Sequence, residues 1–282
     1  MRSWKWRWFA MSFVSEGVGV VTGAGSGIGR ALALRLAEMG SAVALADVDE
    51  AGLMETASLL GEKRAAATTH VVDVADEGAM RQFADDVIAR HGRVTLLINN
   101  AGVSLFGNFE EITVQDFRWV MGVNFWGTIY GVKYFLPVLR RQTRGHIANL
   151  SSVFGMVAPP GQCAYATSKF AVRGFSEALR HELAGTNVGL SVVHPAGVKT
   201  AIARRGRLAA GVPENRKTEG VATLDRVARS SPEQAAEQIL RGVERREPRI
   251  LIGAAARLID VMQRLRPATY WGLMEKRYNL KP

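Results

Sequence analysis

The sequence of 282 residues has very little cysteine and lacks any long hydrophobic run. Its one cysteine, Cys163, excludes a disulfide framework and any metal site built from several cysteines. No stretch of about 18 apolar residues occurs, so the sequence predicts no transmembrane helix. Internal repeats are absent, which argues against solenoids and propellers. With 48% apolar residues, the chain is expected to fold around a hydrophobic core, and we expect a cytoplasmic protein.

Acidic residues are also few, because 36 Lys and Arg face 26 Asp and Glu and give a net charge of +10. The excess lies at the two ends. Residues 1–10 hold three cations and no acid, and residues 199–282 hold 18 Lys and Arg against 9 Asp and Glu. A nucleic-acid enzyme has basic residues around its working motifs more often, so we expect no nucleic-acid partner. Peripheral contact of the basic ends with an anionic membrane surface stays open.

The sequence predicts one folded domain with an extension at each end. Residues 1–12, in which three tryptophans alternate with cations, are expected to be a disordered N-terminal extension. Residues 13–253 form the expected domain. Within it, residues 199–230 lack a strong period and predict a lid. Residues 254–282 predict a basic amphipathic helical extension.

Short apolar runs alternate with helical patterns along the predicted domain. The runs show no apolar–polar alternation, which is typical of strands buried on both faces of a parallel sheet. The fold class is therefore α/β, a single-domain Rossmann-type doubly wound parallel sheet of about seven strands flanked by helices. One long helical stretch covers residues 113–141, and Pro137 is expected to bend or end it. The predicted strands are 18–22, 42–46, 70–72, 94–98, 146–150, 189–193 and 249–252.

A glycine-rich turn, Thr22–Gly29, follows the first predicted strand. Its glycines are spaced G-x-x-x-G-x-G at Gly23, Gly27 and Gly29, and the absence of a following Gly-Lys-Ser/Thr excludes a Walker A loop. Glycines permit a tight turn and a close approach to a pyrophosphate, and the N-terminus of the next helix favours an anion. The turn therefore predicts a dinucleotide phosphate site.

Asp47 ends the second strand, 18 residues after Gly29. A carboxylate at this place can bond ribose hydroxyls and repel a 2′-phosphate, so NAD is favoured and NADP is less expected. Val48 and Ser26 offer no cation, and helical geometry is expected to turn Arg30 away. The alternative for Asp47 is an ordinary helix N-cap.

Tyr165 and Lys169 are spaced i, i+4 in a predicted helix, so both lie on one face. A nearby ammonium favours the phenolate and lowers the pKa of a tyrosine from roughly 10. Ser152 follows the fifth strand, and Asn124 lies in the long helical stretch. Because ligands of parallel sheets bind outside the carboxyl ends of the strands, these residues are expected to converge near the glycine turn.

These motifs together resemble the single-domain branch of the short-chain dehydrogenase/reductase family, from about Val18 to Ile252. Ala196 departs from a segment that often contains Pro-Gly in this family, while Gly197 is expected to keep the turn. The matching motifs are Thr22–Gly29, Asp73, Asn99–Gly102, Asn124, Ser152, Tyr165-x-x-x-Lys169 and His194–Thr200.

The resemblance implies a catalytic tetrad of Asn124, Ser152, Tyr165 and Lys169. Tyr165 would be the general base in alcohol oxidation and the general acid in ketone reduction. Ser152 would bond the substrate oxygen, Lys169 would hold the nicotinamide ribose, and Asn124 would hold a water in a proton relay. The activity implied is hydride transfer between a nicotinamide cofactor and a secondary alcohol or its ketone.

The resemblance also implies a homodimer or homotetramer, with no metal. Asp73 and Val74 would border the adenine, Asn99 and Gly102 the ribose side, and Val198 and Thr200 the carboxamide. The expected cofactor-binding residues are Gly23, Ser26, Gly27, Ile28, Gly29, Asp47, Val48, Asp73, Val74, Asn99, Ala101, Gly102, Tyr165, Lys169, Pro195, Gly197, Val198 and Thr200.

The substrate pocket is expected from residues 104–106, 153–162 and the lid. Its mostly apolar composition favours a neutral, fairly hydrophobic secondary alcohol or ketone. Lid arginines 204, 205 and 207 are expected to be solvated, with contact to an anionic group left open. Cys163 is expected to be an inert, at least half-buried thiol, and His194 to pack at a strand end. Two alternatives stay open, an NADP-preferring carbonyl reductase and a nucleotide-binding scaffold without turnover.

Overall fold

The computed structural model describes residues 13–15 and 17–278, so the expected N-terminal extension lies outside the described residues. Its main feature is a seven-stranded sheet in the order β3-β2-β1-β4-β6-β7-β9, in which every neighbouring pair is parallel. The predicted fold class is confirmed. The strands are β1 (Val18–Thr22), β2 (Ala42–Asp47), β3 (Ala67–Val71), β4 (Leu96–Asn99), β6 (Gly145–Leu150), β7 (Val188–Pro195) and β9 (Arg249–Ile252).

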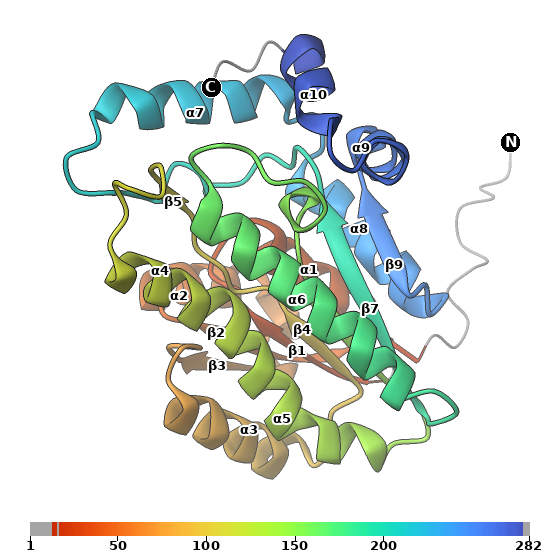
Figure 1. The fold of residues 1–282 in the computed structure, drawn as a ribbon. Coiled ribbons are helices and arrows are strands. Elements are labelled where there is room, and N and C mark those ends of the chain that lie inside the picture. The colour runs from red at the N-terminus through yellow and green to blue at the C-terminus, as the bar shows by residue number, and fades with distance from the viewer. Residues whose placement is uncertain (1–12, 16, 279–282) are drawn as a thin grey trace, which may run out of the picture.

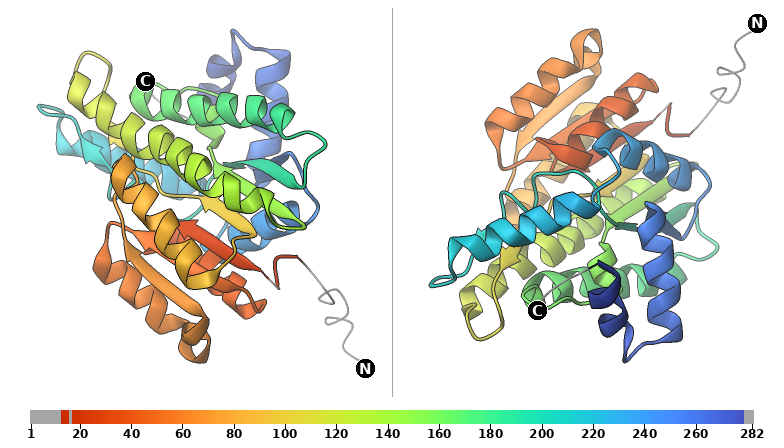
Figure 2. Two further views of the ribbon diagram at one scale, coloured as in Figure 1. Left: turned by 90° about the horizontal axis from the view of Figure 1, so that it is seen from below. Right: turned by 90° about the horizontal axis from the view of Figure 1, so that it is seen from above.

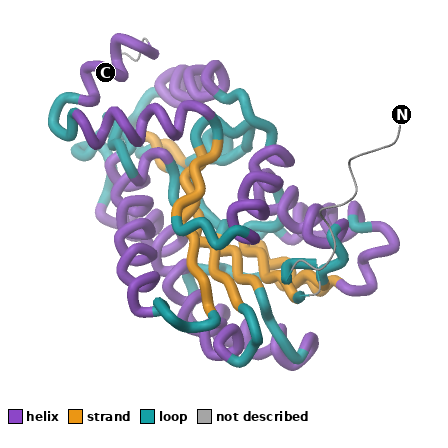
Figure 3. Tube along the Cα trace, turned by 90° about the vertical axis from the view of Figure 1, so that its right-hand side faces the viewer, coloured by secondary structure: helices purple, strands orange, loops and turns teal. Residues whose placement is uncertain are grey.

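Helices cover both faces of the sheet (Figures 1 and 3), which explains why all residues of β1 and β6 are buried. One apolar cluster joins the sheet to α1, α2 and α8, and another joins it to α3, α5 and α6. Each cluster excludes water from one face. The helices are α1 (Gly27–Glu38), α2 (Glu50–Leu59), α3 (Glu77–His91), α5 (Gly127–Arg140), α6 (Cys163–Glu182) and α8 (Pro232–Glu244), with a 3₁₀ segment η1 (Gly61–Ala66) after α2.

The order of the strands reverses between β1 and β4. From β1 the chain builds outward to β3, and it then returns to place β4 on the other side of β1. The turns that follow β1 and β4 therefore leave the same edge of the sheet in opposite directions. A crevice at such a point is where open α/β sheets bind ligands.

The predicted long helix over 113–141 is interrupted, although not at Pro137. The chain forms α4 (Val114–Met121), a π-helical turn η2 (Gly122–Trp126) and then α5. Pro137 lies inside α5, which continues to Arg140. Of the prediction that Pro137 bends or ends the helix, the ending is wrong, and the interruption falls at η2, which contains Asn124. A π-turn frees a backbone carbonyl, and the hydroxyl of Thr128 donates to the carbonyl of Asn124 at 3.0 Å.

The segment 199–230 contains regular structure that its sequence does not predict. Two short strands, β5 (Leu105–Phe106) and β8 (Arg207–Leu208), pair in parallel. Helix α7 (Glu214–Val227) then lies across the end of the molecule above the sheet (Figure 2). Apart from Val227, whose side chain is not described, none of its residues is fully buried. Its first seven residues, 214–220, carry no apolar side chain, so the apolar spacing that follows is too short to predict a helix.

The C-terminal helices α9 (Ala254–Leu265) and α10 (Tyr270–Tyr278) pack back onto the chain. Ala256, Ile259 and Met274 share an apolar cluster with the segment that begins at the short helix η3 (Val153–Gly155). The hydroxyl of Tyr270 accepts a hydrogen bond from the backbone N–H of Ala158 at 3.1 Å. Part of the predicted amphipathic face is therefore used within the chain. No helix in the described part of the chain is long and apolar enough to cross a membrane.

Candidate active site

One cavity of about 590 Å³ opens at the carboxyl ends of the strands. We call the wall formed by the turns after β1, β2, β3 and β4 the cofactor half. The substrate half is the wall formed by residues 103–104, α4, η2, residues 153–162 and the segment 201–228. Three predicted site residues, Gly29, Asn99 and Asn124, do not line the cavity. Those that do are Gly23, Ser26, Gly27, Ile28, Asp47, Val48, Asp73, Val74, Ala101, Gly102, Ser152, Tyr165, Lys169, Pro195, Gly197, Val198 and Thr200.

The glycine turn is held by Asn100, a residue that the sequence analysis did not single out. Its side-chain amide donates to the carbonyls of Thr22 at 2.9 Å and Gly23 at 3.1 Å. Gly23 has a φ of 67°, in the left-handed region that favours glycine. A Cβ on Gly29 would lie 2.0 Å from the carbonyl oxygen of Gly23. Gly29 therefore allows the helix to start close against the turn and does not itself face the cavity.

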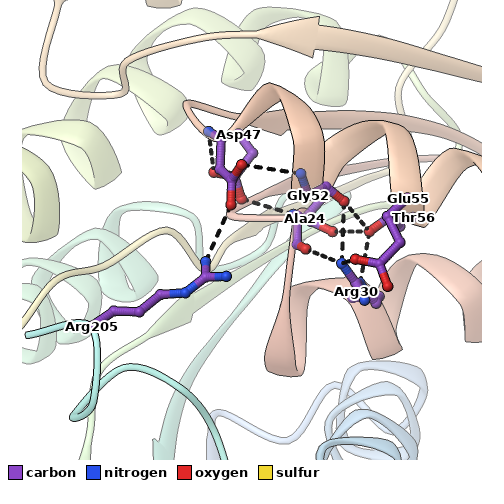
Figure 4. A network of polar contacts seen from close by, with 9 residues as sticks. Ala24, Arg30, Asp47, Gly52, Glu55, Thr56 and Arg205 are labelled. Carbon is purple, nitrogen blue, oxygen red and sulfur yellow. Dashed lines mark hydrogen bonds and ion pairs between the residues drawn. The ribbon is translucent and has the colours of Figure 1, made fainter.

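The carboxylate of Asp47 joins the turn to the end of β2 (Figure 4). One oxygen accepts from the N–H of Gly25 at 2.7 Å, and the other accepts from the N–H of Asp49 at 2.9 Å. The N-cap of α2 is Asp49, which accepts from Gly52 at 3.1 Å. Asp47 is thus not the helix cap that the alternative interpretation required. Its side chain reaches the cavity wall beside the turn.

Arg30 does not line the cavity, as the sequence analysis expected, and Figure 4 shows its side chain beside Glu55 and Thr56. Its guanidinium donates to the carbonyl of Gly25 at 2.5 Å, to Thr56 at 3.0 Å and to Glu55 at 2.6 Å. A different cation enters the cofactor half. Arg205, from the segment after β7, lines the cavity and forms an ion pair with Asp49 at 3.3 Å. Sequence patterns do not reveal this pair, because 156 residues separate its members.

Asn99 is the last residue of β4, and Asn100 is the first residue beyond it. The amide of Asn99 is buried and donates to Asn149 of β6 at 2.9 Å. Asn99 therefore links two strands, while Asn100 lines the cavity.

Tyr165 and Lys169 lie on one face of α6 and line the cavity together. The Lys169 ammonium is buried, donates to the carbonyl of Leu150 at 3.0 Å and lies 5.8 Å from the centre of the Tyr165 ring. Burial lowers the pKa of Lys169 to about 8. Burial also raises the pKa of the Tyr165 hydroxyl, and a hydrogen bond with Ser152 opposes that rise.

Ser152 is positioned by a buried histidine that sequence reasoning assigned only to packing. Nδ1 of His194, on β7, donates to the backbone carbonyl of Ser152 at 2.9 Å. A carbonyl can only accept, so this bond places the imidazole proton on Nδ1. Burial lowers the pKa of His194 to about 4, which keeps the ring neutral around pH 7. The Ser152 hydroxyl accepts from the N–H of Phe154 at 3.1 Å and faces the cavity.

Asn124 supports the site from behind the cavity wall. Its amide oxygen accepts from the N–H of Val103 at 2.7 Å, and its amide nitrogen donates to the carbonyl of Val103 at 3.0 Å. The same nitrogen donates to Ser168 of α6 at 2.9 Å. Asn124 therefore fixes the chain leaving β4 against the helix that holds Tyr165. A role in holding a water stays a prediction.

The substrate half adds two residues that sequence reasoning missed, Trp119 of α4 and Val123 of η2. Arg207 of β8, one of the three lid arginines named from the sequence, lines this half from the opposite segment. Cys163 is exposed and does not line the cavity, so the expectation of an at least half-buried thiol is wrong. It is the first residue of α6, where the chain enters the helix from the surface. No cluster of three metal-ligating side chains occurs among the described residues.

A doubly wound sheet with a glycine turn after β1 and a Tyr-x-x-x-Lys pair facing one cavity defines a class of nucleotide-dependent oxidoreductases. Residues 18–210 match the family model described as short chain dehydrogenase. The chain belongs to the short-chain dehydrogenase/reductase family and is an oxidoreductase.

Similar proteins cover most of the chain. "Putative oxidoreductase SadH" of Mycobacterium tuberculosis is 43% identical over 247 residues, which are 87% of this chain and 89% of that protein. "Dehydrogenase/reductase SDR family member 7B" of Xenopus laevis is 31% identical, over 84% of this chain and 74% of its own. A short-chain dehydrogenase/reductase from Burkholderia phymatum, solved in complex with NAD, superposes with a TM-score of 0.84. It is 34% identical and covers 91% of this chain and 96% of its own.

Proposed function

We propose that this protein is an NAD-dependent oxidoreductase that interconverts a fairly hydrophobic secondary alcohol and its ketone, with Tyr165 as the general acid and base. One observation supports this best. Tyr165, Ser152 and Lys169 converge on a cavity that also contains the glycine turn and Asp47. A proton donor, a hydrogen-bond donor for the substrate oxygen and a dinucleotide site thus share one space.

The cofactor half fits a dinucleotide. The left-handed turn at Gly27, with a φ of 54°, leaves room at the start of α1 that a bulkier, non-glycine residue would not leave. The N-terminus of α1 favours a pyrophosphate, and Asp47 offers carboxylate oxygens to ribose hydroxyls. When bound there, the nicotinamide accepts or supplies the hydride. The NAD in the structure of the Burkholderia relative supports this choice of cofactor.

The proton transfer belongs to Tyr165. Because its pKa is raised, the hydroxyl is protonated at neutral pH and can donate to the oxygen of a ketone. In the oxidation direction the phenolate must accept a proton, so oxidation is expected to speed up as the pH rises. Ser152 donates to the substrate oxygen, and its backbone is held by His194. The Lys169 ammonium stabilises the phenolate electrostatically.

The test follows the absorbance of NADH with a panel of steroid, aliphatic and hydroxylated ketones. In Tyr165→Phe the turnover is expected to fall at least about 100-fold while NADH binding is retained. Tyr134→Phe is the matched control, because Tyr134 lies on α5 outside the cavity and its hydroxyl donates to Glu77 at 2.7 Å. Full activity in Tyr165→Phe would contradict the proposal, and NADH binding without any turnover would favour the scaffold alternative.

The preference for NAD rests on the charge of Asp47. Asp47→Asn keeps an acceptor for the N–H of Gly25 and removes the negative charge, so the ratio of NAD to NADP affinity is expected to fall about tenfold. Asp73→Asn is the control, since Asp73 is the carboxylate after β3 and lines the same half. Dissociation constants from NADH and NADPH fluorescence give this affinity ratio for both variants. An unchanged ratio in Asp47→Asn would remove Asp47 from cofactor choice and favour the NADP alternative.

We also propose a homodimer or homotetramer that pairs the surface of η2 and α6. Trp126 on η2 is 47% exposed and Phe170 on α6 is 38% exposed, which is costly for such large apolar side chains. Trp126→Glu is expected to shift the sedimentation coefficient toward that of a monomer. Phe109→Glu, which changes another exposed aromatic residue, is the control. Contact of the basic ends with a membrane, and a cytoplasmic location, stay predictions.

A further inference from the structure

The substrate half contains one cation whose position is fixed. Arg207 belongs to β8, and its backbone N–H donates to the carbonyl of Ser104 at 2.9 Å. Arg207 stands opposite Leu105 in the parallel pairing of β5 with β8. Its side chain is exposed and lines the cavity. The residue that carries the guanidinium therefore belongs to a hydrogen-bonded strand and not to a free loop.

An aromatic ring orients this guanidinium. The carbon at its centre lies 3.7 Å from the centroid of the Trp119 ring, within the range of a cation–π contact. Trp119 is half-buried on α4 and packs against a cluster that contains Leu105, Val120 and Ala164. The N–H groups of a guanidinium lie in the guanidinium plane. When that plane is stacked parallel to an indole ring, the N–H groups point outward and remain available to a ligand.

The neighbouring lid arginines are neutralised, and Arg207 differs from them. Arg204 pairs with Asp225 at 2.8 Å, and Arg205 pairs with Asp49 at 3.3 Å. No ion pair among the described residues includes Arg207. Asp116 is near enough for the charge of Arg207 to help lower its pKa, although the carboxylate is bonded to Thr113. Arg207 thus offers unused charge to the cavity.

The rest of this half is largely apolar. Val123, Val153, Phe154 and Leu224 line it, and the ring of Phe154 meets the ring of Tyr165 edge-on at 6.2 Å. A substrate that fills this space needs an apolar body. A largely apolar wall that also presents one cation without an ion-pair partner among the described residues favours a ligand with one anionic group.

We propose that Arg207, stacked on Trp119, binds an anionic group of the substrate, a carboxylate or a phosphate, at a distance from the carbon that reacts. The proposal rests on the proposed function and refines its substrate class. The substrate is then an amphiphile with a secondary alcohol or ketone, an apolar stretch and an anionic group. This replaces the expectation of a wholly neutral substrate. The guanidinium fork matches both anions, because each presents paired oxygens to two N–H donors.

The experiment compares substrates that differ only in the anionic group. One is an oxodecanoic acid whose ketone is next to its terminal methyl group, the second is its methyl ester, and the third is the corresponding ketoalkyl phosphate. The wild type is expected to prefer the acid or the phosphate to the ester at least tenfold in kcat/KM. The preference should decline at high ionic strength, because Arg207 is exposed. The larger of the two preferences identifies the anion.

Arg207→Met removes the charge while keeping an apolar side chain over Trp119. It is expected to raise KM for the anionic ketone about 10- to 100-fold and to leave kcat for the ester unchanged. Arg204→Met is the matched control, since Arg204 is a lid arginine that does not line the cavity. Trp119→Leu is expected to give a smaller rise in KM, because the guanidinium remains without its orienting ring.

The failure of this proposal differs from the failure of the proposed function. If the ester is reduced as well as the acid and the phosphate, or if the preference survives in Arg207→Met, the anion subsite is overturned while the oxidoreductase stands. If no ketone is reduced, calorimetry with the NADH-loaded protein decides. Tighter binding of the oxodecanoic acid to the wild type than to Arg207→Met supports the subsite, and equal binding overturns it.

Discussion

The two halves of the cavity are built in different ways. In the cofactor half, backbone groups and half-buried side chains fix each other, as Asn100 does for the carbonyls of Thr22 and Gly23 and Asp47 does for the N–H of Gly25. In the substrate half, exposed residues such as Arg207 project from a two-residue strand and a helix without a buried face. A change in the first half has to move backbone, whereas a change in the second moves mostly side chains.

The difference matches what each half has to recognise. A dinucleotide has an invariant pyrophosphate and ribose, so turns made by glycine and backbone N–H groups suffice and tolerate little change. A substrate varies, and loops and lids on a rigid scaffold provide variable contacts. The comparison therefore predicts large effects of small changes in the cofactor half and small effects of similar changes in the substrate half.

The largest effect is expected for Gly29→Ala in the cofactor half. The new methyl group would lie 2.0 Å from the carbonyl oxygen of Gly23 and 2.5 Å from the amide of Asn100, so the turn would have to open. We expect a loss of about 3 kcal/mol in the free energy of unfolding and a loss of NADH binding of at least tenfold. Urea denaturation and NADH fluorescence measure the two.

Gly174→Ala is the control for Gly29→Ala. Gly174 lies in α6 with open space where its Cβ would be, so alanine should add up to about 1 kcal/mol from helix propensity alone. Equal stability of the two variants would show that the close contact at Gly29 is not what holds the turn.

Lys169→Met is expected to change how stability depends on pH. In the folded chain without cofactor the pKa of Lys169 is about 8, against 10.5 for the side chain exposed in the unfolded chain. Between these values the unfolded state holds a proton that the folded state has released, so a rising pH stabilises the wild type. Relative to Lys169→Met, the wild type should gain about 2.5 kcal/mol from pH 7 to pH 10.

Urea denaturation at several pH values measures this gain. Lys133→Met, which removes an exposed lysine of α5, controls for the loss of one charge. The free energies of unfolding of the wild type and of Lys169→Met could instead change in parallel between pH 7 and pH 10. That result would show that burial in the folded protein does not disfavour the charged form of Lys169.

Gly220→Ala tests the substrate half with a contact of the same kind. A Cβ at Gly220 in α7 would lie 2.9 Å from the ring of Phe106, which can turn aside. Because helix propensity offsets the contact, we expect a stability within about 1 kcal/mol of the wild type. The KM for the ketone should change several-fold, and the dissociation constant of NADH should not. A loss of stability as large as that of Gly29→Ala would refute the contrast between the halves.

The smallest effect is expected for Asp49→Asn, which breaks the ion pair with Arg205 between the two halves. Both side chains are exposed, at 39% and 62%, and such pairs contribute about 0–1 kcal/mol. Asparagine keeps the N-cap of α2. We expect an unchanged melting temperature and a dissociation of NADH that is a few-fold faster by stopped flow. Asp225→Asn breaks the pair between Asp225 and Arg204 and serves as the control. Equal NADH dissociation rates in the two variants would show that the pair between Asp49 and Arg205 does not slow the release of the cofactor.

Local patterns were sufficient for the sheet and for most of the cofactor half. The runs without alternation indicated strands buried on both faces, and the seven parallel strands confirm the predicted architecture. The glycines of the turn Thr22–Gly29 lie within a few residues of one another, and so do Tyr165 and Lys169. Spacing alone therefore locates each of these two motifs. Helix α7 could not be predicted, because its first seven residues carry no apolar side chain and the apolar spacing after them is short.

The sequence by itself determined the family, the doubly wound sheet and most of the residues that line the cavity at its carboxyl edge, because all of these depend on short-range spacing and on the direction of parallel strands. Only the tertiary structure decided which side chains meet across the chain. It directed Asn100 rather than Asn99 into the cavity, brought Arg205 to Asp49 and stacked Arg207 on Trp119. These contacts join residues far apart in sequence, and packing rather than local propensity sets their geometry.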